Sequence, residues 1–139
     1  MVNRDIVSAK LIHVQQILDR LKEKQAVGRQ VFSDQKDLQD IVLFNLQVAI
    51  QGCVDIASHI VSDHSWGVPQ SLADLFNILY KKKVITSKTR DTMRAMAGFR
   101  NIVVHEYKEI DMNLVYGILT KRLSDFNIFL KEVSNYAKL

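Results

Sequence analysis

The chain has 139 residues, of which 47% are apolar and 24% charged, the proportions of a globular domain rather than of a disordered chain. The formal net charge of +4 and the pI of about 9.2 are compatible with an anionic partner such as nucleic acid, but do not demonstrate one. No apolar run reaches the length of a membrane span and no signal peptide opens the chain, so we expect no membrane segment and a cytoplasmic location. One Pro and five Gly favour a few long helices over many short strands.

The first predicted helix covers residues 3–24, where apolar side chains recur at alternating spacings of four and three. This stripe consists of Val7, Leu11, Val14, Leu18 and Leu21. Residues 25–32, which contain Gly28, are predicted to be a connection.

A second helix is predicted from Ser33, as its N-cap, to about Ser62. Asp34 and Asp37 suit the positive N-terminal end of that helix. About thirty residues at 1.5 Å each give roughly 45 Å, which exceeds the width of a small domain. We therefore expect this helix to be the spine of the fold, with Gly52 as its one weak point.

Polar residues recur on the second helix at intervals of four, so their side chains form a ridge on one face. The ridge consists of Gln47, Gln51, Asp55 and His59. Two interpretations stay open: a solvated outer face, or a polar seam that lines a cleft or a subunit contact.

Two other candidate chemistries are weak. The acids and imidazoles Asp55, His59, Asp63 and His64 could suggest a metal, but without a second supporting cluster we expect no metal and no cofactor. The single Cys53 lies in the apolar sequence AIQGCVDIA, where a buried small side chain is the default and a catalytic thiol the less favoured alternative.

The second half of the chain is predicted to hold a loop and three helices. The loop spans 63–71, and Ser71 with Asp74 has the reciprocal capping pattern of a short helix ending near Tyr80. A further helix begins at Thr86 or Ser87. Asp111 caps a last helix, whose buried face carries Val115, Ile118, Leu119, Phe126, Phe129, Leu130 and Val133. The predicted fold is an all-α antiparallel bundle of four long helices plus a short one, in a single domain over residues 1–139.

Positive charge is concentrated between residues 81 and 100, with Asp91 as the one acid there. The cations are Lys81, Lys82, Lys83, Lys88, Arg90, Arg94 and Arg100. A solvated helix end is one interpretation of this run, and a surface that faces RNA phosphates is the other.

The segment GFRNIVVHEY, residues 98–107, departs from the ordinary amphipathic pattern. With Met96 at zero and 100° per residue, Phe99 and Val103 fall at about 300° and 340°, and Arg100 at about 40°, inside the apolar stripe. A guanidinium stays charged, so its burial requires a paired anion or a wet cleft. His105 would lie about 140° from Arg100 on an ideal helix, and the two converge only if the helix distorts or Arg100 reaches around it.

Arg100, Asn101, His105 and Tyr107 together resemble the signature of HEPN-domain ribonucleases, in which an Arg is followed by four residues, His, any residue and Tyr. The chain is similar in particular to HepT toxins of HepT–MntA toxin–antitoxin systems. The segments NLQVAIQGCVDIASHI (45–60) and WGVPQS (66–71) also resemble their counterparts in that family.

The resemblance implies a homodimeric, metal-independent endoribonuclease toxin that cleaves tRNA or mRNA, with its motifs brought together at the subunit interface. Arg100 and His105 would be catalytic, and Asn101 and Tyr107 would support them. It further implies a cognate MntA-like nucleotidyltransferase antitoxin that adds AMP to Tyr107. The RNA-binding patch would comprise Lys81, Lys82, Lys83, Lys88, Arg90 and Arg94.

Two competing interpretations come from other functional classes. The first is a nucleotide- or RNA-binding helical module that acts through a nucleotidyltransferase partner and cleaves nothing. The second is a structural helical dimer in which Arg100 belongs to a salt-bridged interface.

Overall fold

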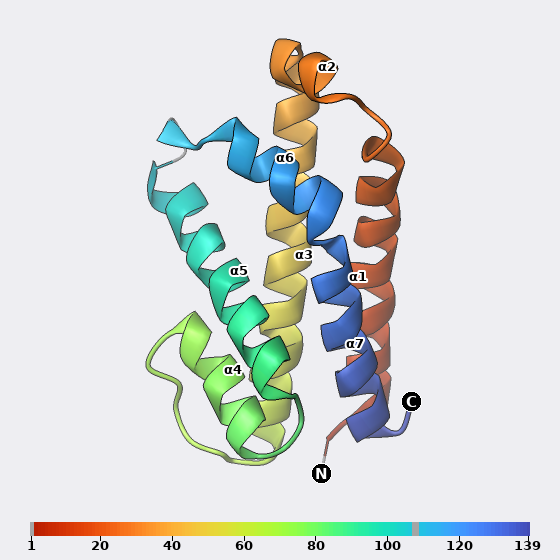
Figure 1. Cartoon of the computed structure of the whole chain (residues 1–139). Helices are drawn as coiled ribbons and strands as arrows, with labels where there is room; N and C mark the ends of the chain where they lie inside the picture. Colours follow the sequence, from red (N-terminus) through yellow and green to blue (C-terminus); the bar gives the residue numbers. More distant parts are fainter. Residues whose placement is uncertain (1, 107–108) are drawn as a thin grey trace.

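The computed structural model describes residues 2–106 and 109–139, which contain seven α-helices and no strand. The helices are α1 (Arg4–Lys24), α2 (Arg29–Asp34), α3 (Lys36–Asp63), α4 (Leu72–Lys81), α5 (Ser87–Glu106), α6 (Met112–Lys121) and α7 (Leu123–Ala137). The long helices α1, α3, α5 and α7 alternate in direction (Figure 1). The predicted all-α antiparallel bundle is confirmed.

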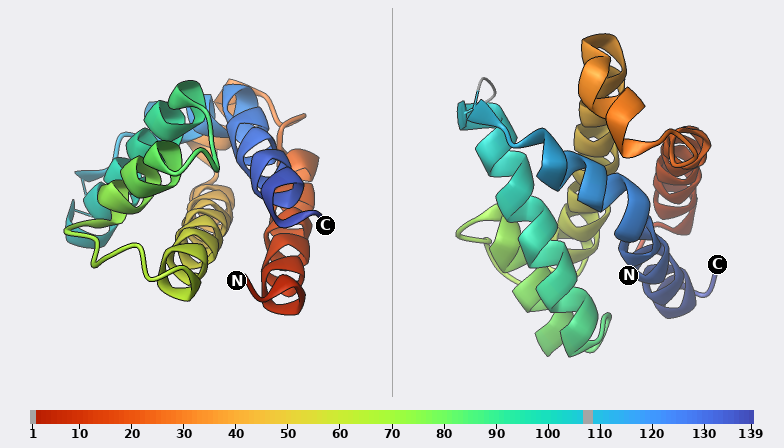
Figure 2. Two further views of the ribbon diagram at one scale, coloured as in Figure 1. Left: turned by 90° about the horizontal axis from the view of Figure 1, so that it is seen from below. Right: turned by 45° about the horizontal axis from the view of Figure 1, so that its top comes forward.

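Helix α3 is the centre of the bundle and contacts each of the other six helices. Seen from below, α4 and α5 lie on one side of it and α1 and α7 on the other (Figure 2). Its length and a mean hydropathy of 1.5 over 18 residues would allow a membrane span by composition alone. Half of that window is buried inside the bundle, as in a core helix, so this composition is weak evidence for a span. The predicted spine is confirmed.

Helices α1 and α3 pack closely at Gly52. A Cβ atom added to Gly52 would lie 2.4 Å from Cγ2 of Val14, which is itself fully buried. Gly52 does not interrupt α3, which runs on without a break to Asp63. The glycine is therefore a packing requirement and not a bend.

The first connection contains a helix that the sequence pattern did not predict. Residues Arg29–Asp34 form α2, and Ser33 lies inside it, so Ser33 as an N-cap is wrong. The N-cap of α3 is Gln35, which makes no side-chain cap bond. Phe32 explains the difference: it is 1% exposed, and a turn of helix carries its ring into the core.

The predicted last helix is two helices. Asp111 does cap the first, because its side chain accepts a hydrogen bond from the Asn113 N–H at 2.9 Å. The helix then breaks at Arg122 and continues as α7. Neither Gly nor Pro stands at the break. The break lets α6 pack on α2 while α7 packs on α5, which a single straight helix would not allow.

Side chains fix the first residues of both α4 and α5. Ser71 Oγ accepts from the Asp74 N–H at 3.1 Å, as predicted, but Asp74 in return accepts from the Gln70 N–H rather than from that of Ser71. At the start of α5, Glu132 of α7 accepts from the Thr86 N–H at 2.7 Å and from the Thr89 hydroxyl. These bonds set where α5 begins and therefore where its far end points.

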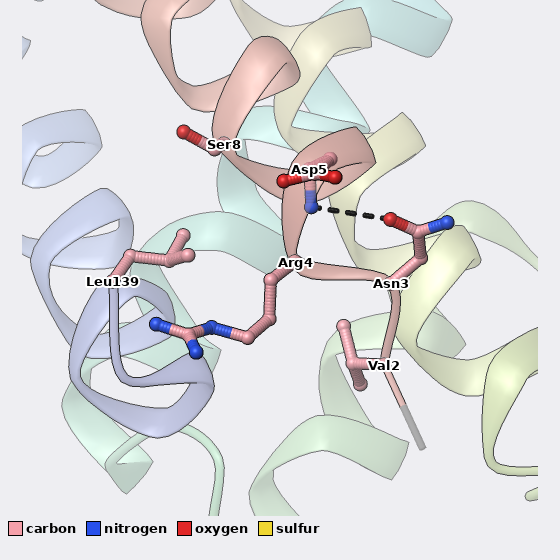
Figure 3. A pocket seen from close by; sticks show the side chains of 6 residues that line it. All are labelled: Val2, Asn3, Arg4, Asp5, Ser8 and Leu139. Atoms are coloured by element: carbon pink, nitrogen blue, oxygen red, sulfur yellow. Dashed lines mark hydrogen bonds between the residues drawn. The ribbon is translucent and has the colours of Figure 1, made fainter.

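The two chain termini meet at one end of the bundle, where they border a shallow pocket of about 440 Å³ (Figure 3). Asn3 caps α1 by accepting from the N–H groups of Asp5 and Ile6. The Arg4 guanidinium donates to the carbonyl oxygen of Lys138. This pocket contains no residue of the predicted signature.

Replacing Gly52 with Ala is expected to lower the free energy of unfolding by about 1–3 kcal/mol, because the added methyl overpacks against Val14. Gly117→Ala in α6 is the control, since a Cβ there meets nothing within 4 Å. That change should leave stability equal or higher by up to about 1 kcal/mol through helix propensity. Urea unfolding followed by circular dichroism measures both, and an unchanged midpoint for Gly52→Ala would contradict the packing argument.

Candidate functional site

The predicted signature lies in the last two turns of α5, and buried apolar residues fix its orientation. Met96, Phe99 and Val103 are buried on the inner face of the helix. Arg100 is half-buried beside them, whereas Asn101 and His105 are exposed. The helix continues through Glu106, so no distortion near Val104 turns His105 toward Arg100. Within one chain the two side chains remain on different sides of the helix.

A cleft of about 620 Å³ joins three segments that are distant in sequence. Arg100 and Asn101 of α5 form one side, Gln51 and Asp55 of α3 form another, and the start of α4 closes it. The remaining lining residues are Val54, Ser58, Pro69, Gln70, Ser71, Leu72 and Leu75. Two members of the predicted polar ridge thus face a cleft, which favours the polar-seam interpretation for Gln51 and Asp55. Gln47 and His59 are not part of the lining.

Arg100 faces this cleft without a partner among the described residues. Within residues 2–106 and 109–139 its guanidinium forms no hydrogen bond and no ion pair. The nearby Asp55 carboxylate instead accepts from Gln51 Nε2 at 2.8 Å. A partly buried guanidinium needs either a paired anion or access to water. In the described part of the chain Arg100 has the second, because it lines an open polar cleft. No described residue occupies the donor fork of Arg100, a geometry that suits recognition of an external anion.

His105 is exposed on the last turn of α5 and does not line the cleft. The stripe formed by Arg94, Asn101 and His105 follows spacings of seven and four along one exposed face. Asn101 belongs both to this face and to the cleft, and so links the two. The fourth signature position, Tyr107, lies outside the described residues.

The predicted basic patch surrounds the α4–α5 turn. Lys81, Lys82, Lys83 and Lys88 are exposed, and so is Arg94 farther along α5. Arg90 is half-buried: its guanidinium lies 4.3 Å from the Tyr80 ring centroid, and its Nε lies 3.0 Å from Asp91. From Lys88 to His105 the helix rises about 25 Å, so most of the patch is at the opposite end of α5 from the signature.

Neither a catalytic thiol nor a metal site is supported by the geometry of the described part of the chain. Cys53 is fully buried, and burial raises the pKa of its thiol, so a nucleophilic thiolate is not available. His59 Nε2 lies 3.1 Å from Asp63, and His64 Nε2 is 2.9 Å from the Tyr136 hydroxyl. No three His, Cys, Asp or Glu side chains among residues 2–106 and 109–139 are grouped to hold a metal ion.

Three residues of the cleft, Val54, Ser58 and Gln70, were not predicted from the sequence to belong to a site. Ser58 lies seven residues after Gln51, on the same face of α3, and this spacing could have extended the predicted ridge. Gln70 reaches the cleft because the loop before α4 folds back onto α3, a tertiary contact that has no local signal.

The arrangement of helices matches that of known HEPN toxins. The tri-AMPylated HEPN toxin of Shewanella oneidensis, in its complex with an MNT antitoxin, superimposes with a TM-score of 0.88 and is 33% identical. The match covers 96% of this chain and 99% of that one. The fold is therefore that of the helical HEPN class.

Sequence comparison narrows this class to one family. The model of the family described as ribonuclease HepT-like matches residues 14–133. The mRNA nuclease HepT of Shewanella oneidensis is 35% identical over 126 residues, 91% of this chain and 94% of the relative. The tRNA nuclease HepT of Aphanizomenon flos-aquae is 26% identical over 131 residues, 94% of this chain and 89% of the relative. The chain belongs to the HepT-like ribonuclease family.

Arg100→Ala is expected to change the free energy of unfolding by less than about 1 kcal/mol, because it leaves no described carboxylate unpaired. Removing one partner of a buried ion pair instead costs about 3–5 kcal/mol. Val103→Ala, on the same helix and 1% exposed, is the control and should lower stability by about 2 kcal/mol. Denaturant unfolding at one fixed protein concentration compares the three chains. A loss near 4 kcal/mol for Arg100→Ala would favour the structural interpretation of the motif.

Proposed function

We propose that this chain is a cytoplasmic, metal-independent endoribonuclease and the toxin of a toxin–antitoxin pair. The observation that supports it most directly is Arg100, which lines a polar cleft and has no partner among the described residues, five residues before an exposed His105. If Arg100 had a structural role alone, we would expect its half-buried guanidinium to be paired with a carboxylate. Here the donors are offered to a ligand, and the family points to RNA.

The proposed chemistry uses the RNA 2′-hydroxyl as nucleophile. His105 accepts the proton of that hydroxyl as the general base, a role that imidazole side chains commonly take in catalysis. The 2′-oxygen then attacks the phosphorus, and the bond to the 5′-oxygen breaks. Arg100 donates to the phosphate oxygens as charge develops on them. One product ends in a 2′,3′-cyclic phosphate, and the other takes up a proton as a 5′-hydroxyl. Asn101 supports the site by orienting His105 from one turn away or by holding the RNA.

The separation of Arg100 and His105 around α5 is the argument for a homodimer. Because one chain does not bring the two together, we propose that each site takes Arg100 from one subunit and His105 from the other. The surface beside the cleft fits a subunit contact. Phe44 shares the helix face of Gln51 and is 64% exposed, and Val104, one turn beyond Arg100, is 54% exposed. Such apolar side chains next to a polar cleft favour burial by a second copy.

The basic patch is proposed to attract RNA independently of its sequence. Lys81, Lys82, Lys83, Lys88, Arg90 and Arg94 would contact backbone phosphates, and this attraction should weaken as salt rises. Arg94 continues along the exposed face of α5 toward Asn101 and His105, so the patch leads to the signature.

The proposed partner is an MntA-like nucleotidyltransferase antitoxin that adds AMP to Tyr107. The related HEPN toxin is tri-AMPylated and in complex with an MNT antitoxin, which supports such a partner here. Tyr107 follows His105 by two residues. Bulk and negative charge added there would repel the RNA phosphates that approach His105.

Induced expression is expected to stop growth and to fragment total RNA, whereas His105→Ala at equal soluble level should do neither. Total RNA resolved on a gel gives the readout, and the size of the fragmented species distinguishes tRNA from mRNA as the target. Intact RNA and normal growth with both chains would favour the RNA- or nucleotide-binding module. Fragmentation by the His105→Ala chain at the parent rate would exclude His105 as the base.

Mixing two inactive variants tests the shared site. Arg100→Ala and His105→Ala chains, each inactive alone, should recover up to about half of the parent cleavage per mixed dimer, because each mixed dimer keeps one intact site. Adding Phe44→Glu to both chains should abolish recovery by separating the subunits. Ile12→Glu is the control, because Ile12 is an exposed side chain of α1 outside the proposed contact, and it should leave recovery unchanged. In vitro RNA cleavage with size-exclusion chromatography measures both effects. No recovery in a mixture that does form dimers would show that the two residues act within one chain.

A further inference from the structure

A second pocket, of about 450 Å³, lies at the opposite end of α5 from the signature. The α4–α5 turn and the C-terminal half of α7 form it, near the lower end of the molecule in Figure 1. Its lining consists of Tyr80, Lys83, Val84, Ile85, Thr86, Glu132, Asn135 and Tyr136. None of these residues belongs to the proposed catalytic site.

Lys83 stands where the backbone favours glycine. Its φ is 63°, in the left-handed region. The Val84 N–H donates to the Leu79 carbonyl at 2.9 Å and the Lys83 N–H to that of Tyr80 at 3.0 Å, which is the Schellman ending of a helix. Glycine is the usual residue at this position because it lacks a Cβ. A lysine held there, exposed at the rim of a pocket, is a local departure of the kind found at binding sites.

Two aromatic rings at or near this pocket each contact a cation. Tyr80 is 38% exposed, and the Arg90 guanidinium lies 4.3 Å from its ring centroid. Lys82 Nζ lies 5.7 Å from the centroid of Trp66, whose ring also stacks on His64; neither Lys82 nor Trp66 lines the pocket. Rings interleaved with cations are how proteins hold single-stranded nucleic acid, since bases stack on the rings and phosphates meet the cations.

The inner lining favours a base over a phosphate. The Glu132 carboxylate accepts from the Thr86 N–H and the Thr89 hydroxyl, and its charge disfavours a phosphate within the pocket. The Tyr136 hydroxyl is taken by His64. The Asn135 side chain is exposed and has no partner among the described residues, so its amide can both donate to and accept from a base edge.

We propose that this pocket is an exosite for an unpaired base of the RNA. The base stacks on Tyr80, Asn135 bonds its edge, and Lys83 holds the adjoining phosphate. This inference rests on the proposed function, because it assigns the pocket to the same RNA. From Thr86 to His105 the helix rises roughly 28 Å. At about 3.4 Å per nucleotide of a stacked strand, about eight nucleotides separate the exosite from the cleaved bond.

Lys83→Gly is the sharpest test, because it should raise the melting temperature while it weakens RNA binding. In the His105→Ala background, which removes cleavage, binding of a labelled single-stranded RNA of about 16 nucleotides is measured by fluorescence anisotropy against salt. Lys83→Gly should weaken binding several-fold and reduce the salt slope by about 0.7. Tyr80→Ala should weaken it about tenfold, and Tyr80→Phe, which keeps the ring, should bind as the parent does.

An RNA of about six nucleotides is too short to span both sites, so the parent should bind it less tightly than the long RNA, and Tyr80→Ala should remove most of this difference between the two RNAs. The exosite is wrong if the long RNA binds the Lys83→Gly and Tyr80→Ala chains as tightly as the parent, or if the parent binds no RNA. Cleavage is scored separately with the intact His105 chain. If the parent cleaves RNA and neither variant changes cleavage or binding, the exosite is wrong and the proposed function stands. If the chains bind RNA as expected for the exosite but the parent does not cleave it, the proposed function is wrong and the exosite stands.

Discussion

The packing of α3 against the six other helices is the constraint on which the rest of the fold depends. A helix surrounded in this way has to be apolar over most of its circumference, and its buried side chains form much of the core. Gly52 lets α1 approach α3 closely on one side. On another side Gln51 and Asp55 stay half-buried and face the cleft. One helix thus organises the core and supplies a wall of the candidate site.

This constraint explains which parts of the fold could be predicted. The stripe of Val7, Val14, Leu18 and Leu21 and the caps Ser71 and Asp111 are local signals, and the structure agrees with them. Helix α2 and the break at Arg122 have no local signal. The first follows from the burial of Phe32, and the second from the different partners of α6 and α7. Both are decided by tertiary packing, which periodicity along one helix does not record.

The candidate site also combines features that the sequence predicted with features that depend on tertiary packing. The sequence identified Arg100 as an anomaly because a charge stood in an apolar stripe, and it identified a polar ridge on the second helix. That Arg100 and two residues of this ridge share a cleft depends on how α5 packs against α3. The hydrogen bonds that Thr86 and Thr89 donate to the Glu132 carboxylate contribute to this packing by fixing the start of α5. The family signature connected His105 to Arg100, yet the regular helix keeps them apart within one chain. This separation is why the proposed site is shared between two subunits.

Arg100 and Lys83 share a feature that local folding preferences do not explain. An apolar side chain would suit the stripe at position 100, and glycine would suit the left-handed turn at position 83. In both places a cation stands instead, and in both it borders a cavity. Lys83 lies in the turn before α5 and Arg100 near the far end of α5, so most of the length of this helix separates them. A linear polyanion is a ligand that would engage both ends of such a helix at once. The cations at positions 83 and 100 therefore support a single elongated RNA-binding surface along α5 rather than two unrelated sites.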